Sequence, residues 1–147
     1  MTWYPHKTVA TVVERDGRFL MVEERADGEV VFNQPAGHLE AGETLAQAAL
    51  RETLEETGWQ VQLQNYLGLY HYISSANQES YLRSCFIATP VSPVENFELD
   101  RDIIQAHWLT LEQIHGLKDR LRSPVVLRVL EDYRHGISYP LSVVTTL

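Results

Sequence analysis

Cysteine is almost absent from this sequence: Cys85 is the only one among the 147 residues. An internal disulfide therefore cannot form, which excludes a secreted domain that depends on disulfides for its stability. We expect Cys85 to be a buried structural thiol, because a reactive cysteine needs an activating base nearby.

Long apolar runs and an excess of basic residues are also missing. No segment approaches the ~20 apolar residues of a membrane-spanning helix, and no signal-peptide pattern is visible. We therefore expect a cytoplasmic protein without a membrane partner. The 20 acidic residues outnumber the 12 basic ones and give a net charge of −8, whereas a general nucleic-acid surface is basic. No nucleic-acid partner is expected, but an anionic ligand is possible where metal ions or a local basic group mediate the contact.

The residues that are present fit one compact domain over 1–147, without a repeat or a linker. Two Asp-Gly pairs, at 16–17 and 27–28, separate apolar runs and predict tight hairpin turns. The runs at 8–13, 19–24 and 30–33 are predicted to form a three-stranded meander.

The rest of the chain alternates between helical and strand patterns. The predicted strands are 61–73, 81–88 and 103–109, and the predicted long helices are 43–57, which Gly58 ends, and 124–135, which Ser123-Pro124 begins. Thr110 and Gln113 resemble a capping box that opens a short helix. The stretch 89–102 contains two prolines and several acidic residues and is predicted to be a surface loop. This order of elements predicts one α/β domain.

Three glutamates, Glu52, Glu55 and Glu56, occupy five consecutive positions of the helix predicted over 43–57. Like charges three and four residues apart repel by about 0.2–0.5 kcal/mol per pair. At 100° per residue the three acids share an arc of about 100°. The predicted core stripe lies apart from this arc and comprises Leu50, Thr53, Leu54 and Thr57.

An acidic face exposed to water is the ordinary explanation of such a cluster. The small residues Ala48 and Ala49 beside the acids favour a bound divalent cation instead, because they leave room next to the carboxylates. Hard cations such as Mg²⁺ take oxygen ligands. A zinc site is not expected, since the six histidines show no ligand spacing and the cysteine stands alone.

The spacing over residues 37–59 resembles the Nudix box of pyrophosphohydrolases. Its positions are Gly37, Glu43, Arg51, Glu52, Glu55, Glu56, Gly58 and Trp59. The resemblance implies a Nudix-type α/β/α sandwich with a mixed β-sheet. The family has an aliphatic residue where this chain has Thr53, and we expect the Thr53 hydroxyl to bond to a helix carbonyl.

The resemblance also implies the chemistry of the site. Nudix enzymes hydrolyse a nucleoside diphosphate linked to a further group and require Mg²⁺ or Mn²⁺. The implied metal ligands are Glu52, Glu55 and Glu56, with the Ala36 carbonyl as a further candidate and Glu52 also as a candidate base. Arg51 is expected to orient a glutamate by a bidentate hydrogen bond. Glu43 either supports the metal shell or is a first-turn acid favoured by the helix dipole.

Substrate recognition is less sharply indicated. The segments flanking the box are similar to one phosphatase subgroup of the family, which implies nucleoside di- and triphosphates and thiamine-pathway pyrophosphates, including thiamine diphosphate, as substrates. Arg83, Tyr72 and Phe32 are candidate substrate-binding residues, although Arg83 is equally well explained as a paired structural arginine, and strand aromatics are more often core. Five later acids are each a candidate extra ligand or base: Glu79, Glu95, Glu98, Asp100 and Asp102.

Several alternatives stay open from the sequence alone. A nucleotide-sensing Nudix module with weak or no catalysis is the main alternative to an enzyme, although such modules typically lose acids from the box. The physiological substrate, the released product and the number of metal ions are open, and monomer and dimer are both compatible with the family.

Overall fold

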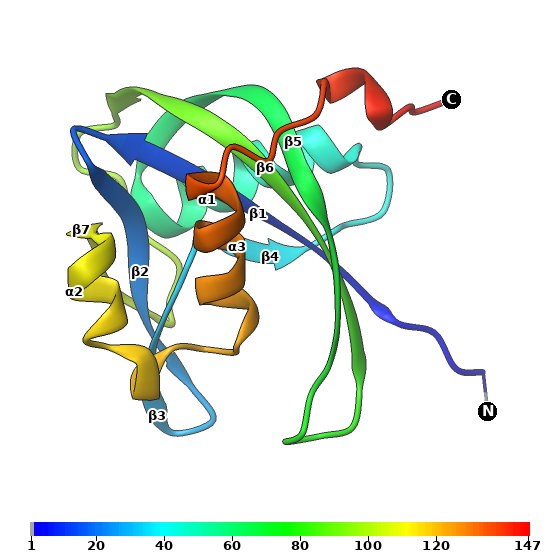
Figure 1. Cartoon of the computed structure of the whole chain (residues 1–147), viewed down its shortest axis with the longest axis horizontal. Coiled ribbons are helices and arrows are strands. Elements are labelled where there is room, and N and C mark those ends of the chain that lie inside the picture. Colours follow the sequence, from blue (N-terminus) through cyan, green and yellow to red (C-terminus); the bar gives the residue numbers. More distant parts are fainter. Residues whose placement is uncertain (1) are drawn as a thin grey trace.

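The computed structural model describes residues 2–147 and is shown in Figure 1. The strands are β1 (His6–Arg15), β2 (Arg18–Ala26), β3 (Glu29–Asn33), β4 (Ala36–His38), β5 (Trp59–Ile73), β6 (Ser80–Pro93) and β7 (Ile103–Thr110). The helices are α1 (Leu45–Thr57), α2 (Leu111–His115) and α3 (Val125–Arg134), with short 3₁₀ turns η1 (Lys118–Arg120) and η2 (Leu141–Val143). None of the helices in this described range is long and apolar enough to cross a membrane.

The two predicted Asp-Gly turns are confirmed. Asp16 and Gly17 have φ of 52° and 78°, and Asp27 and Gly28 have φ of 51° and 81°. Two successive left-handed residues are the signature of the type I′ hairpin turn. The first hairpin is short, however, because β1 and β2 pair only through Glu14 and Arg15 before they diverge.

Strand β1 lies at the centre of the sheet. Beyond its short pairing with β2 it runs parallel to β6 and antiparallel to β4. Strand β2 pairs instead with β3 and β7, and β5 pairs with β6 in a long antiparallel hairpin. The strand order is β3-β2-β1-β6-β5, with β4 beside β1 and β7 beside β2. The predicted mixed sheet is confirmed.

Two sequence predictions about strands were wrong. The first part of the predicted loop 89–102 belongs to β6, which continues to Pro93 and stays paired with β5. Prolines fit there because β1 stops pairing with β6 at Ala88, so no strand on that edge requires the missing N–H groups. Strand β4 lies between β3 and α1, where no strand is predicted from the sequence, because three residues are too few to give an alternating pattern.

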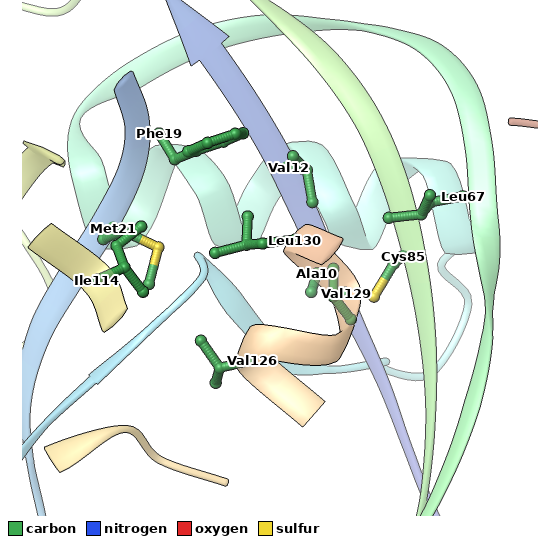
Figure 2. Packing of buried hydrophobic residues seen from close by; sticks show 10 residues of the cluster. All are labelled: Ala10, Val12, Phe19, Met21, Leu67, Cys85, Ile114, Val126, Val129 and Leu130. Atoms are coloured by element: carbon green, nitrogen blue, oxygen red, sulfur yellow. The ribbon is translucent and has the colours of Figure 1, made fainter. Parts of the chain in front are cut away.

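Helices cover both faces of the sheet, as Figure 1 shows with α1 behind it and α3 in front. On the α1 side, Ala48 and Ala49 pack on Val9 and Phe86. The larger core on the α3 side, drawn in Figure 2, contains Ala10, Val12, Phe19, Met21, Leu67, Cys85, Ile114, Val126, Val129 and Leu130. The predicted α/β/α sandwich is confirmed, and Cys85 is buried as expected.

The predicted helix starts are largely confirmed. The Thr110 hydroxyl accepts a hydrogen bond from the Gln113 N–H, and the Gln113 side chain accepts one from the Thr110 N–H, so the capping box is present. The Ser123 hydroxyl accepts from the Val125 N–H at the start of α3. In the tail, which showed no clear pattern, Tyr139 pairs with Tyr66 of β5.

The predicted core stripe of α1 was wrong in part. Leu50 is 39% exposed, and the buried residues of α1 are Ala48, Ala49, Thr53, Glu56 and Thr57. The alanines let the helix approach the sheet closely, so the face that packs on the sheet is the small-residue face and the leucine turns outward. As a result Glu56 belongs to the buried face, and the acidic arc and the core side of α1 overlap.

Candidate metal centre

Helix α1 is fixed at both ends. At its start the Thr44 hydroxyl accepts from the Gln47 N–H and the Gln47 side chain accepts from the Thr44 N–H, each at 3.0 Å. At its end Gly58 has φ of 75° and donates its N–H to the Leu54 carbonyl. Glu43 precedes the cap and lies outside the helix, so its interpretation as a first-turn acid was wrong.

Arg51 binds several glutamates at once. Its Nε and Nη2 donate to the two Glu43 oxygens at 2.5 and 2.9 Å, which is a bidentate pair. Its Nη1 donates to Glu52 Oε1 at 2.5 Å and to Glu55 Oε1 at 2.8 Å. The hydrogen bond from Arg51 is the main cause that lowers the pKa of Glu43. Arg51 thus fixes the direction of the Glu43 carboxylate, which lies before α1, and of the Glu52 and Glu55 carboxylates on the helix.

Glu56 is a buried carboxylate that forms no ion pair within residues 2–147. The residue is 8% exposed, and its Oε1 accepts a hydrogen bond from the Ala36 N–H at 2.9 Å. Burial raises the pKa of Glu56 to about 9. Ionising such a group near neutral pH requires a compensating positive charge, which a bound cation supplies.

Three carboxylates converge around Glu56. One oxygen each of Glu52, Glu56 and Asp100 lies within 4.8 Å of the others, so these residues could hold a metal ion together. Asp100 comes from the segment between β6 and β7, and its N–H donates to the Glu55 carbonyl at 2.9 Å. This bond attaches the segment to the end of α1 and brings its carboxylate to the site.

The sequence-predicted ligands thus divide into two groups. Glu52 and Glu56 lie in the three-carboxylate group, whereas Glu55 lies outside it and is held by Arg51. Asp100 was one of five equivalent later acids in the sequence, because no local pattern shows that its loop docks on α1. Among the other four, Glu79 instead contacts His6 at 2.7 Å.

Gly37 and Ala36 of β4 border the carboxylates. A Cβ on Gly37 would overlap the carboxyl group of Glu52, so the strand and the helix approach each other only because residue 37 is glycine. The Pro35 carbonyl accepts a hydrogen bond from the Thr11 N–H of β1, and the Leu39 N–H donates to the Lys7 carbonyl of β1. In an antiparallel ladder Ala36 is then a non-hydrogen-bonded position. Its carbonyl therefore points away from β1, on the same side as the N–H that binds Glu56.

Thr53, the departure from the family pattern, is fully buried. Its hydroxyl donates to the Ala49 carbonyl at 2.7 Å, which confirms the expected bond to a helix carbonyl. It also lies 2.8 Å from the Thr11 hydroxyl of β1. The threonine therefore ties α1 to the central strand and takes no part in the carboxylate group.

The three candidate substrate residues have different surroundings. Arg83 is partly exposed and donates to Gln34 Oε1 at 3.0 Å and Asn33 Oδ1 at 3.3 Å. Tyr72 pairs with Tyr81, which lies two residues before Arg83 on β6. Because residues two apart on a strand point to the same side, Tyr72 and Arg83 lie on the same face of the sheet. Phe32 is 6% exposed and carries the Arg120 guanidinium over its ring, which leaves little ring surface for a substrate.

Comparison with known proteins decides the family. A family model described as a NUDIX domain matches residues 4–130. The chain belongs to the Nudix family. This Nudix chain is 40% identical to phosphatase NudJ from Escherichia coli (strain K12) over 140 residues, which cover 95% of this chain and 90% of NudJ. The resemblance to the family and to a phosphatase subgroup, predicted from the sequence, is confirmed.

Solved structures agree with this assignment. A NUDIX hydrolase from Nitrosomonas europaea is 39% identical, with 98% of both chains covered and a TM-score of 0.94. A MutT protein from Methanosarcina mazei Go1 has a TM-score of 0.72 over 92% of this chain and 99% of its own, and at 21% identity it shows the shared fold alone. The predicted Nudix fold and the prediction of a hydrolase are confirmed.

Proposed function

We propose that this Nudix hydrolase cleaves phosphoanhydride bonds of small phosphorylated molecules with the help of Mg²⁺ or Mn²⁺. The substrates in view are nucleoside di- and triphosphates and thiamine-pathway pyrophosphates such as thiamine diphosphate, and the expected location is the cytoplasm. The observation that carries the proposal is the group of Glu52, Glu56 and Asp100, whose oxygens lie within 4.8 Å of one another. The 40% identity to a phosphatase supports it.

The donor set fits these cations. All three side chains offer oxygen, which Mg²⁺ prefers, and ligands at 2.0–2.1 Å in an octahedron lie at most about 4.2 Å apart. The observed limit of 4.8 Å therefore requires only small side-chain adjustments. Glu56 is buried without a cationic partner within the described residues, and a bound cation would stabilise its ionised form. The Ala36 carbonyl and Glu55, after release from Arg51, are proposed as further ligands.

The residues of the chain would divide the chemistry among them. A bound cation would neutralise phosphate oxygens and lower the pKa of a coordinated water. Glu52 is proposed as the base that accepts the proton of the attacking water. Arg51 would keep the Glu52 carboxylate in place through the Nη1 contact, and Glu43 would keep Arg51 in place through the bidentate pair.

The decisive experiment combines a substrate panel with ligand variants. Purified protein is mixed with nucleotides and thiamine diphosphate, with and without Mg²⁺, and phosphate and pyrophosphate release are assayed separately. Glu56→Gln and Asp100→Asn should each lower turnover by more than about 100-fold while the fold is retained. Glu95→Gln removes an exposed acid from the same segment as Asp100 and serves as the matched control. Near-normal activity of Glu56→Gln at saturating Mg²⁺ would falsify the metal assignment.

A further inference from the structure

Arg83 carries a positive charge that no carboxylate neutralises directly. Within residues 2–147 it takes part in no ion pair, whereas Arg122 pairs with Glu24 at 2.8 Å and Arg51 with several glutamates. Its two contacts are the neutral amide oxygens of Gln34 and Asn33. A guanidinium has five N–H donors, so these contacts fix its position and leave donors and charge for an anion.

The two amides are themselves fixed. Gln34 is 1% exposed, and its Nε2 donates to the Val126 carbonyl at the start of α3 at 2.8 Å. Asn33 is also buried, and its backbone pairs with Val22 of β2. The guanidinium of Arg83 is therefore held in one place by groups that depend on α3 and β2.

That place is next to the candidate metal centre. Gln34 lies two residues before Ala36, whose N–H donates to Glu56. Two residues of extended chain span at most roughly 7 Å. Burial lowers the pKa of Arg83, and the charges of Glu24 and Glu56 oppose this lowering. A diphosphate that reaches from the carboxylate group to Arg83 would present its second phosphate to the guanidinium.

We propose that Arg83 binds the second phosphate of the substrate, the one joined through the bridging oxygen to the phosphorus that water attacks, and that Gln34 positions Arg83 for this contact. The inference rests on the proposed function and narrows it. Diphosphates and longer phosphoanhydrides carry the group that Arg83 recognises, and phosphate monoesters do not. Gln34 is a positioning residue, because it acts only through Arg83.

The test compares two probes in the presence of Mg²⁺ by titration calorimetry. Methylenediphosphonate has two phosphorus groups joined by carbon, so water does not cleave it, and inorganic phosphate has one. Arg83→Gln should weaken binding of the diphosphonate about tenfold or more, because charged hydrogen bonds are lost. Binding of inorganic phosphate should stay within about twofold. Arg18→Gln, which removes the same charge from an exposed site on β2, should change neither affinity.

Gln34→Leu separates positioning from packing. It should weaken the diphosphonate more than phosphate and raise KM for a nucleoside diphosphate while kcat is largely retained. A purely structural role of Gln34 would instead lower Tm and leave the ratio of the two affinities unchanged, which overturns its assignment. If Arg83→Gln does not fold, Arg83→Lys replaces it. The lysine ammonium keeps the charge but lacks the planar guanidinium that reaches both amide oxygens.

The two proposals fail in different ways. Equal affinity of wild type and Arg83→Gln for the diphosphonate overturns the role of Arg83, whether or not the enzyme needs a metal. Binding of the diphosphonate that is the same with Mg²⁺ and with a chelator contradicts the metal chemistry. In that case the change in diphosphonate affinity caused by Arg83→Gln still tests the role of Arg83.

Discussion

The carboxylate of Glu52 lies in the space that a side chain on residue 37 would occupy. A Cβ on Gly37 would overlap the carboxyl carbon and both oxygens of Glu52. Glu52 is also bound by Arg51, so its carboxylate cannot withdraw without losing that contact. Strand β4 and helix α1 therefore meet at a point where only glycine fits.

Gly37→Ala should inactivate the enzyme more than it destabilises the fold. The added methyl group displaces the Glu52 carboxylate, and a displacement of about 1 Å at a reacting centre can cost about 100-fold in rate. We expect a loss of that size in kcat/KM with a folded protein by circular dichroism. Activity within a fewfold of wild type would show that Glu52 does not need its present position.

Gly42→Ala is the matched control in the same loop. Gly42 has φ of +80°, and a methyl group added there would have no other atom within 4 Å. Alanine at this position therefore meets backbone strain but no neighbour. A cost of about 1–2 kcal/mol in the free energy of unfolding is expected. The activity of the folded fraction should be retained, in contrast to Gly37→Ala.

Removal of metal should make stability depend on pH through Glu56. In the unfolded chain its pKa is about 4.5, and burial raises it to about 9 in the folded protein. The folded state therefore holds this proton more tightly, and the stabilisation is complete below pH 4.5 and is lost as pH rises towards 9. The free energy of unfolding should fall by up to about 1.4 kcal/mol per pH unit in this window.

Urea unfolding in a chelator at several pH values measures this slope. Glu56→Gln has no proton to lose at this position and should give a flatter profile than wild type. Saturating Mg²⁺ should flatten the wild-type profile as well, because the bound cation stabilises the ionised carboxylate. Parallel profiles of the two proteins in the chelator would show that Glu56 does not carry the pH dependence.

Local signals in the sequence were sufficient for much of this fold. The Asp-Gly turns, the Thr110–Gln113 capping box and the glutamates of α1 each depend on residues a few positions apart, and the structure contains all three. The extension of β6 to Pro93 depends instead on pairing with β5 and on the end of β1, which lie far away in the sequence. No pattern within 89–102 reveals that partner.

The site shows the same division. Glu52 and Glu56 could be placed from helical spacing, but Asp100 joins them only because its loop docks on the end of α1 through the Glu55 carbonyl. Arg83 was a candidate substrate-binding residue in the sequence, with a paired structural arginine as the alternative. Arg83 has no carboxylate partner within the described residues and is held by two amides. Both features depend on tertiary structure and leave no local signal in the sequence.

Cys85 should be unreactive in the native protein. It is fully buried, and burial raises the pKa of its thiol to about 12. Because the thiolate is the reactive form, a disulfide reagent at pH 8 should label native protein only as fast as the chain opens. The reagent should label one thiol rapidly in urea. Labelling of native protein at the rate of free glutathione would contradict this burial.

The hydroxyls of Thr11 and Thr53 should be coupled in stability. They lie 2.8 Å apart in the core, and Thr53 also donates to the Ala49 carbonyl. Thr53→Val removes the partner of a buried hydroxyl on Thr11, which costs about 1–3 kcal/mol. Thr11→Val should cost less, because Thr53 keeps its bond to Ala49.

The double variant decides whether the pair acts as a unit. With valine at both positions no buried hydroxyl is left unpaired, and replacing both partners by apolar groups of similar shape is close to neutral. Urea unfolding should therefore give a double variant that is less destabilised than the sum of the single ones, with kcat/KM near wild type in all three. Additive costs would mean that the two hydroxyls contribute independently. A coupled result would explain why threonine is tolerated where the family has an aliphatic residue: its hydroxyl is matched by a second one on the central strand.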